Sequence, residues 1–157
     1  MCSSDLTAAA FTCDELHTLR QKLAVGSRRL DLWVVVYSHQ LSEAVVPYLE
    51  LCDVVTYWTW RAEDLTILEG SFAEFDNLLP AKRKVLGCYM WDFGAARPLP
   101  LESMKQQCEL GRAWLLAGRI EGMIFLASPI CDLELEAVEW TRQWIDQVGD
   151  ELLGAES

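Results

Sequence analysis

Aromatic and polar side chains gather where short apolar segments of this chain end. Three such clusters contain the residue types that could contact a ligand, and a fourth runs from residue 127 to residue 132. Aromatic rings can stack on a ligand, and a histidine can orient a hydroxyl or a carboxylate. Side chains two apart on a strand share a face, which pairs Tyr37 with His39 and Trp58 with Trp60. The residues are Tyr37, His39, Trp58, Trp60, Tyr89, Trp91 and Asp92.

The apolar segments that precede these clusters are rich in valine, which is typical of strands covered on both faces. They predict four strands, at residues 32–37, 54–58, 85–90 and 122–126. Between successive strands the chain has enough helical sequence for the crossover that a parallel pair requires. Because parallel strands end at one edge, the clusters are expected to meet there.

Helix signals separate the strands. Thr12 and Glu15 form a capping-box pattern, Gly26 offers a stop, and Pro47 suits the first turn of a helix. Asp132 and Glu134 are interpreted as caps of the last helix. The predicted helices are 13–25, 42–51, 62–68 and 72–79 on either side of Gly70, 101–117 and 132–153.

Composition indicates a globular α/β chain and excludes several classes of partner. With 157 residues, 52% of them hydrophobic, the chain is long enough to bury the core of a single domain over residues 1–157. The net charge of −11 argues against nucleic acid and anionic membranes as partners. No apolar run is long enough to cross a bilayer, and no signal peptide is recognised at residues 1–5. The chain as written is therefore expected in the cytoplasm, or outside the cell if an N-terminal part is missing.

The six cysteines are predicted to be reduced and mostly buried, because no two of them form a Cys-x-x-Cys pair. The two histidines, His17 and His39, lie far apart and not at ligand spacing from a cysteine. We therefore expect neither a metal site nor a cofactor.

Three segments carry a resemblance to a known class of protein. Residues 53–60, 87–94 and 118–125 resemble the last strands of a (β/α)8 barrel of the glycoside-hydrolase-like kind. The four predicted βα units would then correspond to strands five to eight of a TIM barrel, a half-barrel. An open, doubly wound parallel sheet is the alternative fold, and we found no internal repeat that separates the two.

The resemblance implies a carbohydrate-active protein, with glycoside hydrolysis if the chain is an enzyme. Such barrels place a pair of carboxyl groups after the fourth and seventh strands, which match Asp5 and Asp92 here. It also implies an aromatic platform for a sugar, formed by Tyr37, Trp58 and Trp60. The tyrosine and tryptophan pair at Tyr89 and Trp91 is included among the substrate contacts.

Structural interpretations of the same residues stay open. The alternative interpretation of Asp92 is a turn or cap carboxylate before Gly94, and that of Asp5 is a residue of a frayed terminus. The tryptophans can pack beneath helices, and His39 can be simply exposed. A non-catalytic module that binds a saccharide or a partner is the alternative function. A nucleotide-binding open sheet is weakened because no glycine-rich loop follows any strand.

The half-barrel interpretation has one consequence for partners. Four parallel strands alone leave two edges and an apolar face uncovered, which natural proteins normally avoid. We therefore expect a homodimer or a partner chain that completes the barrel. Residues 1–11 are expected to be a stub or a flexible N-terminus, and residues 154–157 a flexible tail.

Overall fold

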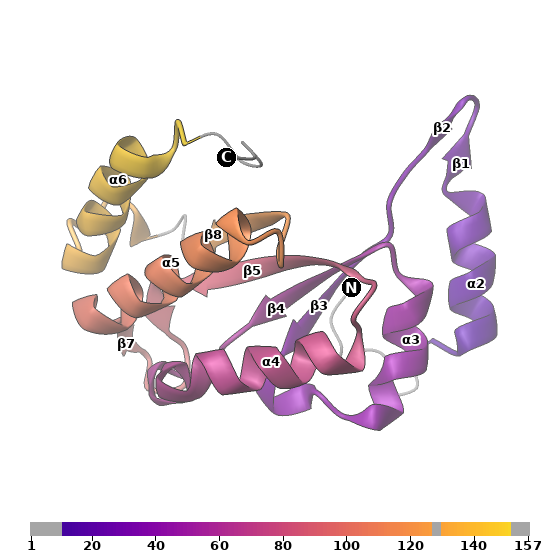
Figure 1. The fold of residues 1–157 in the computed structure, drawn as a ribbon, viewed down its shortest axis with the longest axis horizontal. Helices are drawn as coiled ribbons and strands as arrows, with labels where there is room; N and C mark the ends of the chain where they lie inside the picture. The colour runs from indigo at the N-terminus through magenta and orange to yellow at the C-terminus, as the bar shows by residue number, and fades with distance from the viewer. Residues whose placement is uncertain (1–10, 127–129, 152–157) are drawn as a thin grey trace.

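The computed structural model describes residues 11–126 and 130–151 of the chain (Figure 1). Asp5 lies outside the described residues, as do residues 127–129 of the fourth cluster. The predictions of a flexible N-terminus and a flexible tail also concern residues outside these ranges, apart from Phe11.

A four-stranded parallel sheet forms the centre of the molecule, in the order β3-β4-β5-β8. The prediction of a parallel α/β sheet is confirmed. Every neighbour in the sheet is the next of these strands along the chain, so the order contains no reversal among the described strands. The strands are β3 (Trp33–Tyr37), β4 (Val54–Trp58), β5 (Arg83–Tyr89) and β8 (Gly122–Leu126).

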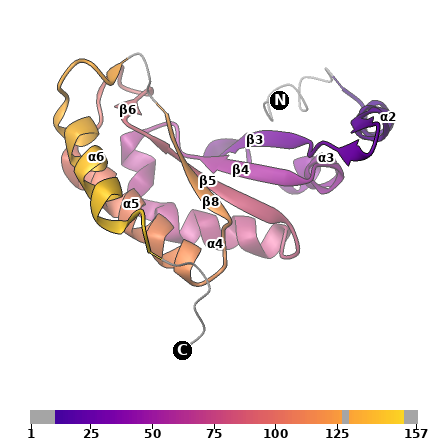
Figure 2. The ribbon, with the colours of Figure 1, turned by 90° about the horizontal axis from the view of Figure 1, so that it is seen from above.

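Helical segments connect these strands, and α4 and α5 lie on the same side of the sheet (Figure 2). The connecting elements are η1 (Ser38–Gln40), η2 (Glu43–Val45), α3 (Val46–Leu51), η3 (Ala62–Ile67), α4 (Leu68–Leu78) and α5 (Leu101–Leu116). The chain also forms α2 (Cys13–Lys22), the hairpin of β1 (Ala24–Val25) and β2 (Arg28–Arg29), the hairpin of β6 (Trp91–Asp92) and β7 (Arg97–Pro98), and α6 (Glu136–Val148).

The main core fills the space between the sheet and its helices. Because side chains alternate between the two faces of a strand, Val36, Tyr57 and Leu86 all point to the helical side. In the parallel register Tyr57 pairs with Val36 on β3 and with Leu86 on β5. The rings of Phe72 and Phe75 from α4 pack on Tyr57, with centroids 5.9 and 4.8 Å away. The opposite face of the sheet therefore presents the alternate residues, including those that end the strands.

A partly buried carboxylate joins the N-terminal elements to the sheet. Asp53, just before β4, accepts hydrogen bonds from Arg20 at 2.5 Å, Arg29 at 3.0 Å and the Leu32 amide at 2.9 Å. Burial alone raises the pKa of Asp53, but these hydrogen bonds and charges outweigh it and lower the pKa overall. The contacts attach α2 and the β1–β2 hairpin to the start of β4.

Several predicted helix boundaries are wrong. Gly26 does not stop a helix that reaches residue 25; α2 ends at Lys22, and Gly26, with a φ of 62°, forms the turn between β1 and β2. Gly70 does not break a helix either, because it lies inside α4. The last helix begins at Glu136 instead of residue 132, and its N-cap is Leu135, so Asp132 and Glu134 are not its caps.

Five cysteines lie in the described part of the chain, and three of them, Cys52, Cys88 and Cys108, are buried, in line with the prediction of mostly buried thiols. Burial raises the pKa of Cys52 to about 11 and that of Cys108 to about 12, and it raises the pKa of Cys88 well above its ordinary value. Thiols with raised pKa values are poor nucleophiles near neutral pH. Within residues 11–126 and 130–151, no helix has both the length and the apolar character needed to cross a membrane.

Candidate functional site

The aromatic residues predicted at the strand ends come together at the carboxyl edge of the sheet. Tyr37 pairs with Trp58 across β3 and β4, and Trp58 pairs with Gly87 across β4 and β5. Tyr89 follows two residues later on β5 and faces the same side. The hydroxyl groups of Tyr37 and Tyr89 lie 3.2 Å apart, within hydrogen-bond distance. Residues more than 50 positions apart in sequence thus form one continuous aromatic surface.

Trp58 forms the buried base of this surface. Its indole lies directly over Gly87, where a Cβ atom would be only 1.9 Å from the ring. The indole Nε1 donates to Thr56 Oγ1 at 2.8 Å, and that hydroxyl donates to the Val34 carbonyl at 3.2 Å. The ring centroid of Tyr89 is 4.7 Å away, and Trp58 is only 5% exposed. Trp58 therefore supports the other rings and is covered from solvent.

Trp60 lies beyond the end of β4 and is half-buried among three rings. Phe93 stacks on it at a centroid distance of 4.9 Å, with an angle of 29° between the ring planes. Tyr37 and Tyr89 meet it edge to face, at 5.5 and 6.0 Å. We name the six side chains Tyr37, His39, Trp58, Trp60, Tyr89 and Phe93 the aromatic cluster.

A cleft of about 610 Å³ opens beside this cluster. Its volume falls in the usual range for small-molecule sites. His39, exposed in η1, stacks on Tyr37 at a centroid distance of 5.7 Å and forms part of the cleft wall. The lining combines three rings with three polar side chains, and its residues are Tyr37, His39, Gln40, Trp60, Arg61 and Asp64.

Four members of the site were not predicted from the sequence: Phe93, Gln40, Arg61 and Asp64. Each directly follows or lies close to a predicted strand end, which is the signal that could have found them. Loop conformation decides which of these side chains face the cleft, and strand periodicity does not extend into loops.

Asp92 is buried outside the cleft, with 4% exposure. Its Oδ1 accepts hydrogen bonds from the Ala62 and Ala95 amides, at 3.3 and 3.2 Å, and its Oδ2 lies 3.5 Å from Arg97 Nε. It borders a separate small hollow of about 290 Å³. Every one of these contacts is one that a structural turn carboxylate makes, and the predicted catalytic role of Asp92 stays a prediction.

Trp91 is half-buried in β6, and no ring contact joins it to the aromatic cluster in the described part of the chain. Asp5, the proposed second carboxylate, cannot be placed because it lies outside the described residues. Among residues 11–126 and 130–151, no three His, Cys, Asp or Glu side chains are grouped so that they could hold a metal ion.

The comparisons with known proteins give no relative for this chain. No protein-family model matches the chain, and no curated protein or solved structure matches it either. The likeness to glycoside hydrolases therefore rests on the sequence segments quoted above.

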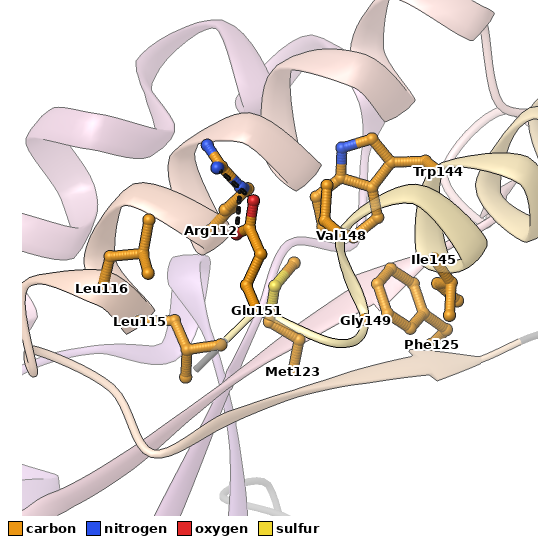
Figure 3. Close-up of a pocket in the computed structure, with 10 residues that line it drawn as sticks. All are labelled: Arg112, Leu115, Leu116, Met123, Phe125, Trp144, Ile145, Val148, Gly149 and Glu151. Carbon is orange, nitrogen blue, oxygen red and sulfur yellow. Dashed lines mark hydrogen bonds and ion pairs between the residues drawn. The ribbon is translucent and has the colours of Figure 1, made fainter. Parts of the chain in front are cut away.

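A second pocket, of about 380 Å³, lies between α5, β8 and α6 (Figure 3). Its lining is mainly aliphatic and aromatic, and Phe125 and Trp144 meet in it at a centroid distance of 6.2 Å. Its charged groups are Arg112 and Glu151, which form two hydrogen bonds of 2.8 and 2.6 Å with each other. Because these charges are already paired, the pocket presents little polar chemistry to a ligand.

Proposed function

We propose that the chain binds a saccharide in the cleft beside the aromatic cluster and does not hydrolyse it. The observation that carries this proposal is one cleft that combines polar side chains with rings from two successive strand ends, those of β3 and β4. The ring of Tyr89, from the end of β5, supports this lining because it packs edge to face on Trp60. The sequence resemblance to carbohydrate-active barrels favours the same class of ligand. Of the two carbohydrate-related functions considered from the sequence, the geometry favours the non-catalytic module.

A saccharide matches both parts of the lining. The C–H face of a pyranose packs on aromatic rings, which Tyr37 and Trp60 supply. Sugar hydroxyls both donate and accept hydrogen bonds, and Gln40, Arg61 and Asp64 offer both kinds of partner. The guanidinium of Arg61 lies 3.0 Å from the carboxylate of Glu63 and is therefore already paired, which favours a neutral sugar over an anionic one.

The number and positions of the carboxylates near the cleft favour binding without hydrolysis. Retaining and inverting glycosidases both need two carboxyl groups that flank the scissile bond, roughly 5 to 9.5 Å apart. Among the described residues, Asp64 is the one carboxylate that lines the cleft. Asp92 is already engaged by two backbone amides and is covered from solvent. A glycosidase pair would need a further carboxylate at the cleft.

The half-barrel remains our proposal for the architecture around this site. Connections between parallel strands are nearly always right-handed. When each strand is added on the same side of the previous one, the connecting helices therefore all lie on one face of the sheet, as in a barrel. A doubly wound sheet reverses direction at a switch point, and the four described strands have no such reversal. A second copy or another chain would then extend the sheet at β3 or β8, which are its edges in the described structure.

The experiment is a calorimetric titration of the full chain with a panel of neutral mono- and oligosaccharides. Replacing Trp60 with Ala is expected to weaken the best ligand about tenfold, which corresponds to ~1.4 kcal/mol. Trp140→Ala is the control, because Trp140 is half-buried on α6 and stacks on Trp144, away from the cleft. Product analysis after long incubation should find no cleaved glycoside.

Two results would contradict the proposal. If no saccharide in the panel binds the folded wild-type chain, the ligand class is wrong. If Trp60→Ala and Trp140→Ala change the affinity equally, the cleft is not the binding site.

A further inference from the structure

We propose that the β6–β7 hairpin positions Trp60 for ligand binding and that Asp92 is the positioning residue. This inference rests on the proposed function for its effect on affinity, but its structural part does not depend on the ligand. It gives Asp92 a role other than the proton transfer or nucleophilic attack that the sequence resemblance implied.

The first support is that one carboxylate joins two segments. Ala62, two residues after Trp60, donates its amide to Asp92 Oδ1 at 3.3 Å. Ala95, in the loop of the hairpin, donates to the same oxygen at 3.2 Å. Hydrogen bonds to a carboxylate are stronger than those between neutral groups, and a buried carboxylate that loses them is costly. Asp92 therefore fixes the hairpin to the segment that carries Trp60.

The second support is the close packing of the hairpin backbone at Gly94 against the side chain of Arg61. A Cβ atom added to Gly94 would lie 2.5 Å from Cγ of Arg61. The hairpin backbone thus approaches the residue next to Trp60 at a distance that a larger side chain would prevent. Ala96 takes a left-handed conformation, with a φ of 51°, as the loop turns back into β7.

The third support is the ring of Phe93, which the hairpin places against Trp60. Phe93 lies between Asp92 and Gly94, which are the two residues that hold the hairpin in place. Its ring stacks on Trp60 at 4.9 Å and meets Tyr89 edge to face at 4.6 Å. Phe93 is 38% exposed, so little besides these contacts holds it. Releasing the hairpin would remove Phe93 from Trp60 and leave the indole free to change its orientation.

The conservative variant separates positioning from catalysis. Asparagine at position 92 keeps an oxygen that can accept from both amides, whereas alanine cannot. Its amide nitrogen would lose the contact with Arg97, but that contact is 3.5 Å long and Arg97 is 64% exposed, so its contribution is small. A carboxylate that transferred protons or attacked a sugar would be disabled equally by both substitutions.

The test follows the Trp60 indole N–H resonance by NMR in the ligand-free full chain, and then measures saccharide affinity. Asp92→Ala is expected to shift this resonance and to weaken saccharide binding about tenfold. Asp92→Asn is expected to leave the Trp60 resonance at its wild-type position and the saccharide affinity within about twofold of wild type. Phe93→Ala, a substitution of a partly exposed ring, provides a second variant if Asp92→Ala does not fold. Because loss of the stacked ring shifts the Trp60 resonance by itself, this variant is evaluated by its saccharide affinity, which should also fall about tenfold.

Asp76→Ala is the control for general destabilisation, because Asp76 lies in an ion-pair network on α4 and contacts no member of the aromatic cluster among the described residues. It should leave the Trp60 resonance in place. An unchanged Trp60 resonance in Asp92→Ala would overturn the positioning role, as would wild-type saccharide affinity in Phe93→Ala. A shifted Trp60 resonance in Asp92→Ala, without saccharide binding by the wild type, would support the positioning role and reject the proposed ligand instead.

Discussion

Gly87 decides where the indole of Trp58 can lie. Any side chain at this position would occupy the volume of the ring, with the closest contact at 1.9 Å. The indole is rigid, 5% exposed and hydrogen-bonded to Thr56, so it cannot easily move aside. The absence of one side chain in β5 thereby allows an aromatic surface to form across three strands.

Replacing Gly87 with Ala is therefore expected to lower the free energy of unfolding by about 1–3 kcal/mol, as overpacking does. Gly70→Ala is the matched control. Gly70 lies inside α4 with open space around its Cβ position, and alanine there should raise stability by about 0.5–1 kcal/mol. Urea unfolding of both variants gives the two changes. Equal effects of the two substitutions would contradict the placement of Trp58 over Gly87.

At the scale of elements, one carboxylate on α4 connects three segments. Asp76 Oδ1 lies 2.8 Å from Lys84 Nζ at the start of β5, and its Oδ2 lies 3.2 Å from Arg119 before β8. Lys84 is only 3% exposed. Arg119 also lies over the rings of Phe72 and Trp114, at 5.2 and 5.6 Å. This network holds the amino ends of two strands against the helical layer.

The stability that Asp76 contributes should depend on pH. Burial raises the pKa of Asp76, but the hydrogen bonds and charges of Lys84 and Arg119 outweigh it and lower the pKa overall. A lowered pKa means that the folded chain binds fewer protons than the unfolded chain. The contribution is present above the unfolded value of about 3.9 and is lost as pH falls through the folded value.

We expect Asp76→Asn to reduce the free energy of unfolding by about 2 kcal/mol at neutral pH, because it leaves Lys84 buried without a carboxylate. The difference from wild type should shrink as pH falls below about 4. Urea unfolding at several pH values measures it, with Asp146→Asn, at an exposed position on α6, as the control. A difference that does not change with pH would show that Asp76 acts through packing alone.

The helices and strands were predicted best where a few neighbouring residues form a specific signal, such as a capping box or an apolar strand run. The capping box is present, because Thr12 Oγ1 accepts from the Glu15 amide and the Glu15 carboxylate accepts from the Thr12 amide. The strands at residues 54–58 and 122–126 have the predicted boundaries. Pro47 lies in the first turn of α3, as expected.

Glycine positions were predicted less well, for a physical reason. Left-handed glycines serve both helix ends and hairpin turns, so Gly26 alone could not distinguish the two. Gly70 costs its helix only about 1 kcal/mol, which the packing of Leu68, Phe72 and Phe75 outweighs. The site shows the same division: strand periodicity predicted Tyr37 and Trp60, whereas Phe93 is placed by a hairpin that no periodicity indicated.

At the scale of the whole molecule, the face of the sheet opposite the helices carries exposed apolar side chains at both edges. Trp33 on β3 is 44% exposed and Leu126 on β8 is 41% exposed. The register places them on the side of the aromatic cluster. Unpaired edges and exposed apolar residues of this kind usually contact another chain or another part of a protein.

If two copies complete a barrel, light scattering should give twice the chain mass of 17.8 kDa. Leu126→Lys should return the mass to that of one chain, because lysine on an edge strand opposes pairing. Leu133→Lys is the matched control, since Leu133 is 59% exposed before α6 and outside the sheet. A well-folded wild-type monomer would contradict the homodimer.

The central claim, saccharide binding beside the aromatic cluster, is tested most directly by a titration observed through the tryptophan indole resonances. The chain has seven tryptophans, which report on different regions of the molecule in a single spectrum. We predict that adding the saccharide shifts the Trp60 resonance progressively and saturably, while those of Trp114, Trp140 and Trp144 stay in place. Shifts confined to Trp144, which lines the apolar pocket, or no shift at Trp60 at saturating saccharide, would contradict the account.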